Sequence, residues 1–187
     1  MTRRKFLMAL LAASVCGAYR NRGFAAPPST MADIERMQKN WQSLLPGGFK
    51  PPRASEPLKL TNEEWRKRLN ASQFYILREE GTERPGSSPL NDEKRPGIFT
   101  CAGCDLPLFT SEMKYDSGTG WPSFFTTIPG AFGTSTDFKL ILPRTEYHCI
   151  RCGGHHGHLF DDGPPPTGKR WCNNGIALKF IPKSGKV

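Results

Sequence analysis

The spacing of hydrophobic residues changes partway along the chain. Before about residue 81, apolar residues recur at helical intervals, and from Ile98 onward they alternate with polar residues as in strands. Short alternating segments separated by Gly and Pro favour antiparallel sheets over a parallel α/β fold. The pattern therefore predicts a mainly β domain preceded by short helices.

Individual elements follow from the same pattern. One helix is predicted over residues 31–45, a second after the capping box Thr61-Asn-Glu-Glu64, and a third between Asn70 and Gly81. Strands are predicted over residues 138–142, 147–150 and 176–181. The inward-facing helical residues are expected to be Met37, Trp41, Leu44, Trp65, Leu69, Phe74 and Leu77.

The chain begins with a pattern typical of an export signal. Three basic residues at positions 3–5 precede an apolar run over residues 6–15, which is shorter than the ~20 residues that span a bilayer. The Arg-Arg pair resembles a twin-arginine signal, and small residues favour cleavage near Ala25. We predict export to a bacterial periplasm, with no transmembrane segment in the mature chain. A lipid anchor on Cys16 is the alternative.

The net charge gives little support for a nucleic-acid partner. The formal charge of the 187 residues is +9, but residues 1–25 contain five basic and no acidic residues, which leaves +4 for the remainder. No basic run interleaved with aromatic residues is present, so we expect no nucleic-acid binding. After the signal we expect a Pro-rich extension over residues 26–57 and a single domain over residues 58–187.

Two C-x-x-C pairs are the most specific chemical signal. Cys101 and Cys104 form the first pair, and Cys149 and Cys152 form the second. Each pair lies on a predicted turn, and Zn²⁺ favours four tetrahedral thiolate ligands. The sequence therefore predicts one structural zinc ion that fixes two sheets relative to each other. A redox dithiol of the thioredoxin type is the alternative, although that motif normally opens a helix.

Cys172 is left over from these pairs. Without Cys16, five cysteines remain after cleavage, so at least one thiol is unpaired. Arg170 and the pair Asn173-Asn174 surround Cys172 with polar groups, and a nearby cation lowers the pKa of a thiol. These neighbours favour a nucleophilic thiol over an inert, buried one.

Other polar and aromatic residues have two interpretations each. His155 and His158, brought toward Cys172 across the G-P-P-P turn, can provide acid–base groups or can be two metal ligands, although four thiolates already complete a tetrahedral site. His148 and His156 are the candidates for structural histidines. Asp162 either orients a histidine or belongs to a turn. Trp121, within G-T-G-W-P-S-F, is either a core residue or an aromatic wall for an apolar group of a ligand.

Together these motifs closely resemble the B-type methionine sulfoxide reductases. The resemblance runs from about Leu58 to Pro182 and rests mainly on C-A-G-C-D-L-P-L-F, G-T-G-W-P-S-F, C-G-G-H-H-G-H-L-F-D-D-G-P-P-P-T-G and R-W-C-N-N. It implies two antiparallel sheets packed as a tent, N-terminal helices and a four-cysteine zinc site. It also implies reduction of the R epimer of methionine sulfoxide, preferentially in oxidised proteins.

The resemblance also implies roles for single residues. Cys172 would attack the sulfoxide sulfur and be left as a sulfenic acid, and His155 and His158 would bind and protonate the sulfoxide oxygen. Trp121 would hold the S-methyl group. The residues that would order this polar network are Arg170, Asp162 and Asn174.

The chain departs from the family pattern at Thr119, where many members have a resolving cysteine. Threonine cannot form the internal disulfide, so we expect an external thiol, such as a thioredoxin-like reductant, to reduce Cys172.

The residues leave two other functions open. One is a non-catalytic four-cysteine zinc module that binds a protein or nucleic acid, and the other is a zinc-containing oxidoreductase that acts on disulfides.

Overall fold

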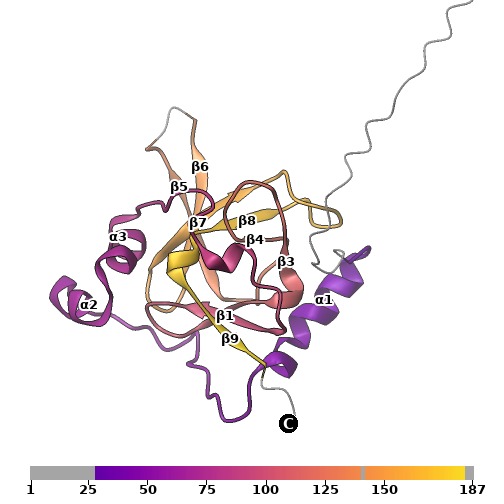
Figure 1. Cartoon of the computed structure of the whole chain (residues 1–187), viewed down its shortest axis with the longest axis horizontal. Helices are drawn as coiled ribbons and strands as arrows, with labels where there is room; N and C mark the ends of the chain where they lie inside the picture. The colour runs from indigo at the N-terminus through magenta and orange to yellow at the C-terminus, as the bar shows by residue number, and fades with distance from the viewer. Residues whose placement is uncertain (1–27, 140–141, 184–187) are drawn as a thin grey trace, which may run out of the picture.

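Two antiparallel sheets form the centre of the molecule (Figure 1). The computed structural model describes residues 28–139 and 142–183. The strands are β1 (Gly97–Cys101), β2 (Pro107–Thr110), β3 (Lys114–Tyr115), β4 (Ser123–Phe124), β5 (Phe132–Asp137), β6 (Arg144–Cys149), β7 (His155–Phe160), β8 (Arg170–Asn173) and β9 (Leu178–Pro182). One sheet has the order β2-β1-β9, and the other has the order β3-β4-β8-β7-β6-β5. The predicted mainly β fold with two antiparallel sheets is confirmed.

Short helices precede the strands, as the sequence predicts. They are α1 (Met31–Lys39), α2 (Asn62–Arg68) and α3 (Ala71–Glu79). Capping boxes form at the N-termini of both α2 and α3. The single helix predicted over residues 31–45 is interrupted, because α1 ends at Lys39 and a 3₁₀ turn, Trp41–Leu44, follows. The remaining 3₁₀ turns described are Pro89–Asn91, Ser111–Met113 and Gly175–Ala177.

The C-terminus of α3 differs from the prediction. The residue that leaves the helix in a left-handed conformation is Glu80 (φ 54°), and Gly81 follows it. Gly81 differs: a Cβ at this position would overlap the ring of Tyr75 in its present position, although Tyr75 is 50% exposed and its ring can move aside. The glycine therefore permits close packing, whereas Glu80 carries the backbone reversal.

The strand predicted over residues 138–142 is wrong. β5 ends at Asp137 and β6 begins only at Arg144, and residues 140 and 141 lie outside the described part of the chain. The N–H of Lys139 donates to Asp137 Oδ1 at 2.8 Å, which forms a local turn. Phe138 and Leu142 are each 76% exposed. The apolar alternation therefore marks the end of a hairpin and not a buried strand face.

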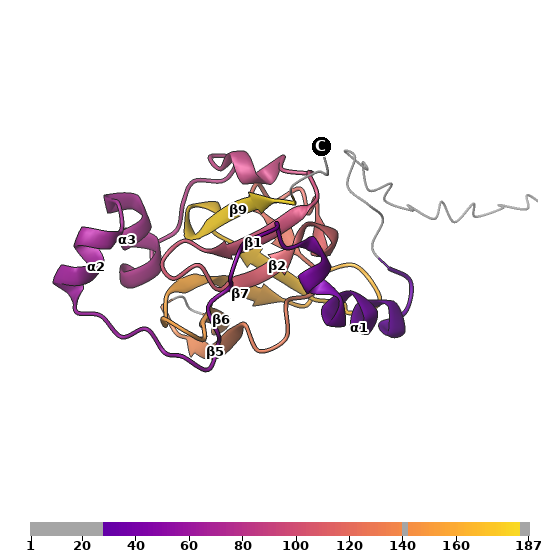
Figure 2. The same ribbon diagram turned by 90° about the horizontal axis from the view of Figure 1, so that it is seen from below.

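The core lies between the two sheets. Phe109 of the smaller sheet stacks on Phe124 of the larger sheet with ring centroids 3.8 Å apart, and Phe99 meets Phe124 edge-on at 5.1 Å. Trp65 of α2 and Leu77 of α3 are buried and belong to the same cluster. The aromatic contacts join the sheets in the middle, while α2 and α3 cover one end (Figures 1 and 2).

Helix α1 of the N-terminal extension packs on the domain at the side opposite α2 and α3, and the chain after α1 runs back along the domain to α2 (Figures 1 and 2). Ile34 of α1 is buried against Tyr115 and Phe125. Gln38 Nε2 donates to Thr126 Oγ1 at 2.7 Å. In the part of the chain that the structure describes, no helix has the length and apolar character needed to cross a membrane.

Candidate active site and metal centre

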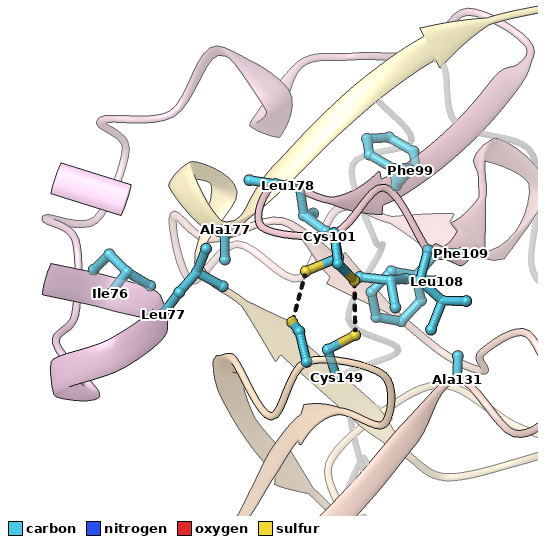
Figure 3. Close-up of a cluster of buried hydrophobic side chains, with 14 of the residues drawn as sticks. Ile76, Leu77, Phe99, Cys101, Leu108, Phe109, Ala131, Cys149, Ala177 and Leu178 are labelled. Carbon is cyan, nitrogen blue, oxygen red and sulfur yellow. Dashed lines mark hydrogen bonds between the residues drawn. The ribbon is translucent and has the colours of Figure 1, made fainter. Parts of the chain in front are cut away.

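The two C-x-x-C pairs meet between the sheets. Cys101 and Cys104 lie on the turn from β1 to β2, and Cys149 and Cys152 lie on the turn from β6 to β7. The Sγ atoms of Cys101 and Cys152 are 3.7 Å apart, those of Cys104 and Cys149 are 3.5 Å apart, and all four ligand atoms lie within 4.8 Å of one another (Figure 3). Tetrahedral coordination with metal–sulfur bonds of about 2.3 Å requires sulfur–sulfur distances of about 3.8 Å. The cluster therefore fits one metal ion.

Both turns have the same backbone geometry. In each, the residue after the second cysteine donates its N–H to the carbonyl of the first, from Asp105 to Cys101 at 2.9 Å and from Gly153 to Cys149 at 2.8 Å. Asp105 (φ 62°) and Gly153 (φ 67°) are both left-handed. Each turn thus presents its pair of sulfurs toward the other, and the cluster joins the two sheets as the sequence predicts.

A β-bulge brings His155 and His158 to the same face of the larger sheet. In regular alternation, residues three apart point to opposite faces. However, Tyr147 pairs with Gly157 and His148 pairs with His155, so one extra residue of β7, His156, has no partner on β6. The rings of His155 and His158 consequently lie 5.5 Å apart.

His156 turns inward and is a structural residue. It is fully buried, its ring meets Phe132, and its Nδ1 lies 3.3 Å from Asn173 Oδ1. Burial lowers the pKa of His156 to about 3, so the imidazole is neutral. This side chain belongs to the core and not to the polar face.

Each of the other two imidazoles is paired with a carboxylate. His155 Nδ1 lies 2.8 Å from Glu146 Oε1, and His158 Nε2 lies 2.7 Å from Asp137 Oδ2. Arg144 Nη2 donates to the same oxygen of Asp137 at 2.6 Å. Burial lowers the pKa of His158 below its usual value, although the hydrogen bond to Asp137 acts in the opposite direction. His158 is therefore neutral at neutral pH.

Cys172 lies opposite His158 on the neighbouring strand β8 and is partly buried. Burial raises the pKa of its thiol, while Arg170 and Thr119 lower it without reversing the direction. The sequence interpretation thus identified the effect of Arg170 correctly but gave the wrong net direction. At neutral pH the resting group is a thiol, and its activation requires a base.

A pocket of about 130 Å³ lies in front of Cys172. Trp121 forms part of its wall, and the indole N–H donates to the carbonyl of Glu83 at 3.2 Å. His158 and Asn174 also line this pocket. Trp121 therefore provides an apolar wall beside a thiol and an imidazole, and is not a core residue.

Two further predicted site residues, Arg170 and Asp162, do not line this pocket, whereas Asn174 does. Arg170 forms two hydrogen bonds with the Asp162 carboxylate, at 2.7 and 2.9 Å, and its guanidinium lies over the Phe160 ring. Asn174 Nδ2 donates to the carbonyl of His156 at 3.0 Å. The Asp162 pair thus holds the Arg170 side chain before Cys172, and Asn174 after it is tied to the backbone of β7.

Glu83 is a site residue that the sequence analysis missed. Its carboxylate accepts the N–H groups of Gly175 and Ile176 at 2.6 and 2.9 Å, which explains why residues 175–177 form a 3₁₀ turn and β9 starts late. Its own N–H donates to Asn174 Oδ1 at 3.0 Å. Because its carbonyl also binds Trp121, Glu83 connects the two walls of the pocket.

The carboxylates behind the histidines were missed as well. Asp137 ends β5 and lies 21 residues before His158, and Glu146 lies within β6 nine residues before His155. Arg144, which binds Asp137, starts β6. The available signal was the charged run Arg144-Thr-Glu146 next to a predicted strand. The pairing of each carboxylate with a particular histidine depends on strand register.

Comparison with known proteins agrees with this geometry. The SelR domain family matches residues 69–182. The chain is 42% identical over 160 residues to Peptide methionine sulfoxide reductase B1, chloroplastic, of Arabidopsis thaliana. This match covers 85% of this chain and 79% of that protein. It is 48% identical to Peptide methionine sulfoxide reductase MsrB of Agrobacterium fabrum over 65% of this chain and 91% of the relative. The chain is also 48% identical to the protein of the same name in Pseudomonas putida, and this match covers 67% of this chain and 95% of that relative.

The chain therefore belongs to the SelR domain family and is an enzyme of the B-type methionine sulfoxide reductase class. This membership favours an enzyme over a non-catalytic zinc module. It also agrees with a site in which one thiol, apart from the metal-type cluster, faces a pocket with an imidazole.

Proposed function

We propose that the protein reduces methionine-R-sulfoxide, preferentially within oxidised polypeptides, with Cys172 as the nucleophile. The observation that carries the proposal is the position of Cys172 directly opposite His158, with both residues on one pocket and His158 backed by Asp137. The names of the relatives support methionine sulfoxide reduction in general. Beyond that general activity, we propose selectivity for the R epimer and a role in the reaction for Cys172, His158, His155 and Trp121.

Proton transfer within this group would start the reaction. Burial keeps Cys172 as a thiol and His158 as a neutral base. With His158 Nε2–H donating to Asp137, Nδ1 is the nitrogen that can accept the proton of Cys172. Asp137 then stabilises the imidazolium, and the thiolate attacks the sulfoxide sulfur.

The reaction reduces the sulfoxide sulfur and oxidises the sulfur of Cys172. Attack forms a bond between Cys172 Sγ and the sulfoxide sulfur. His158 and a protonated His155 then provide two protons, the sulfur–oxygen bond breaks, and the oxygen leaves as water. A water molecule attacks Cys172 Sγ, the bond between the two sulfurs breaks, methionine leaves in the reduced state, and Cys172 becomes a sulfenic acid while the released proton returns to a histidine. Trp121, on the pocket wall, would contact the S-methyl group.

Regeneration would use external thiols. One thiol reacts with the sulfenic acid to release water and form a mixed disulfide, and a second thiol then frees Cys172 and leaves as a disulfide with the first. Within residues 28–139 and 142–183, the other cysteines are the four of the cluster, and Thr119 stands beside Cys172. Mass spectrometry after one turnover should show a Cys172 sulfenic acid trapped by dimedone. An intramolecular Cys172 disulfide would overturn this route.

We propose zinc as the ion of the four-cysteine cluster. Four buried thiolates on two matching turns favour this metal, and it would link the two sheets structurally without entering the reaction. Metal analysis of the purified protein should give about one zinc per chain. Loss of zinc to a strong chelator should lower the unfolding temperature.

We also propose export through the twin-arginine pathway. The support is the basic and apolar pattern of residues 1–25, which lie outside the described residues. A fusion of these residues to a reporter that is active only after export should be active. Replacement of Arg3 and Arg4 by lysine should abolish that activity, and retention of export in this variant would contradict the proposal.

A single-turnover assay with separate epimers tests the reaction. The enzyme should form about one methionine per active site from an R-sulfoxide peptide and none from the S epimer, and Cys172→Ser should form none from either. Equal turnover of both epimers would refute the stereochemical assignment. Unchanged turnover in Cys172→Ser would refute the nucleophile.

A further inference from the structure

Two arginines hold the cysteine turns by their backbone. Arg78 of α3 donates through Nη1 to the carbonyl oxygen of Cys152 at 2.9 Å. Arg151, within the second turn, donates through Nη1 to the carbonyl oxygen of Cys104 in the first turn at 3.1 Å. One guanidinium therefore ties the turn of the larger sheet to α3, and the other ties the two turns together.

Neither guanidinium has a carboxylate as a close partner. In the described ranges, Arg78 and Arg151 form no ion pair within 4.0 Å, and the Nε of each is buried without a hydrogen-bond partner. Arg78 lies over the ring of Trp65 at 5.0 Å. Arg151 acts on Glu56 electrostatically, but Glu56 is exposed and already pairs with Arg53. A partly buried cation without a compensating charge is unfavourable.

A third arginine at the cluster provides the contrast. Arg68 of α2 donates through Nε to the carbonyl of Gly103 at 2.6 Å. Its side chain is 43% exposed and lies 3.7 Å from Asp105. The charge of Arg68 is thus compensated by solvent and by the carboxylate of Asp105. The positive charges of Arg78 and Arg151 are not compensated by a carboxylate within 4.0 Å in the described ranges.

The loaded cluster provides that charge. Four thiolates on a divalent ion carry a net charge of −2, and the two guanidinium groups carry +2. We infer that Arg78 and Arg151 are the counter-charges of the metal-loaded cluster and that they retain the metal. The inference rests on the proposed zinc site and assigns these two residues a positioning role that is separate from sulfoxide reduction.

The test measures zinc release from the holoprotein. Zinc-loaded wild type, Arg78→Met and Arg151→Met are mixed with excess chromophoric chelator, after the zinc content of each has been measured. Methionine keeps the aliphatic volume but removes the charge and the donors, so both variants should release zinc about tenfold faster or more. Arg66→Met is the matched control, because Arg66 lies over Phe74 and pairs with Glu79. It should release zinc at the wild-type rate.

A lysine variant separates charge from packing. Arg78→Lys keeps the positive charge and should release zinc much more slowly than Arg78→Met. Release from both methionine variants at the wild-type rate would overturn the inference, and so would equal acceleration by lysine and methionine. Circular dichroism of each loaded variant checks the fold, and Arg151→Met carries the test alone if Arg78→Met does not fold. A wild-type protein without zinc would instead refute the metal proposal, and sulfoxide turnover is scored separately.

Discussion

His158 Nε2 lies 2.7 Å from Asp137 Oδ2, although the two residues are on strands separated by β6. Asp137 is the last residue of β5, and Arg144, its partner at the start of β6, binds the same oxygen. The carboxylate is thus fixed on one side by the end of the hairpin and on the other by the imidazole that faces Cys172. The contact converts a histidine on a sheet surface into an oriented base.

Asp137→Asn should lower kcat/KM by on the order of 100-fold, because the imidazolium of His158 loses its compensating charge. Asp137 raises the pKa of His158 through a hydrogen bond and its charge, so the substitution should lower that pKa. The acidic limb of the pH–rate profile should therefore move to lower pH. Asp161→Asn, at a side chain that is 82% exposed, is the control. An unchanged acidic limb would argue against His158 as the base.

Glu83→Gln should destabilise the protein by about 1–3 kcal/mol. Both carboxylate oxygens accept backbone N–H groups, from Gly175 and Ile176, and the glutamine NH₂ would face one of these donors. The pocket walls that Glu83 connects should also shift, so KM should rise. Urea unfolding and steady-state kinetics measure the two effects. Glu79→Gln, at an exposed position on α3, should change neither, and wild-type stability in Glu83→Gln would contradict the assignment.

Glu146→Gln should remove part of the acid sensitivity of the fold. Although burial alone would raise it, hydrogen bonds from His155, His148 and Ser135 lower the pKa of Glu146 from 4.5 to about 2. A carboxyl with a depressed folded-state pKa stabilises the fold above its unfolded pKa, and this contribution is lost as the pH falls through the folded pKa. Wild type should therefore lose stability more steeply than the variant between about pH 4.5 and 2.

Urea unfolding at several pH values in this window gives the difference between the two proteins. The cysteine cluster is common to both, so its own acid sensitivity cancels in the comparison. A difference in the free energy of unfolding that stays constant with pH would show that Glu146 is not the titrating group.

Thr119→Val should make Cys172 a weaker acid. Burial raises the pKa of this thiol, and the Thr119 hydroxyl acts in the opposite direction together with Arg170. Valine has a similar shape and no hydroxyl, so the pH at which iodoacetamide modifies Cys172 half-maximally should rise. Thr136→Val, at an exposed residue of β5, is the control. A midpoint that does not move would show that the hydroxyl does not stabilise the thiolate.

The sequence predicted the features whose partners lie close together along the chain. The capping boxes at Thr61 and Asn70 form because the donor and the acceptor are three residues apart. Each C-x-x-C pair closes its own turn, but the meeting of the two pairs, with Cys104 and Cys149 45 residues apart, was predicted from the preference of Zn²⁺ for four thiolates and not from proximity along the chain. The strand over residues 138–142 failed, because alternation records only which side chains point the same way. It does not show whether another layer covers them.

The tertiary structure decided the chemistry around Cys172. A single extra residue, His156, places His155 and His158 on one face, and the register of β5, β6 and β7 gives each imidazole its carboxylate. Burial, a property of the whole fold, reversed the expected direction of the Cys172 pKa shift. The residue types were therefore readable from the sequence, whereas their pairing was not, because contacts across strands depend on register and burial and not on local spacing.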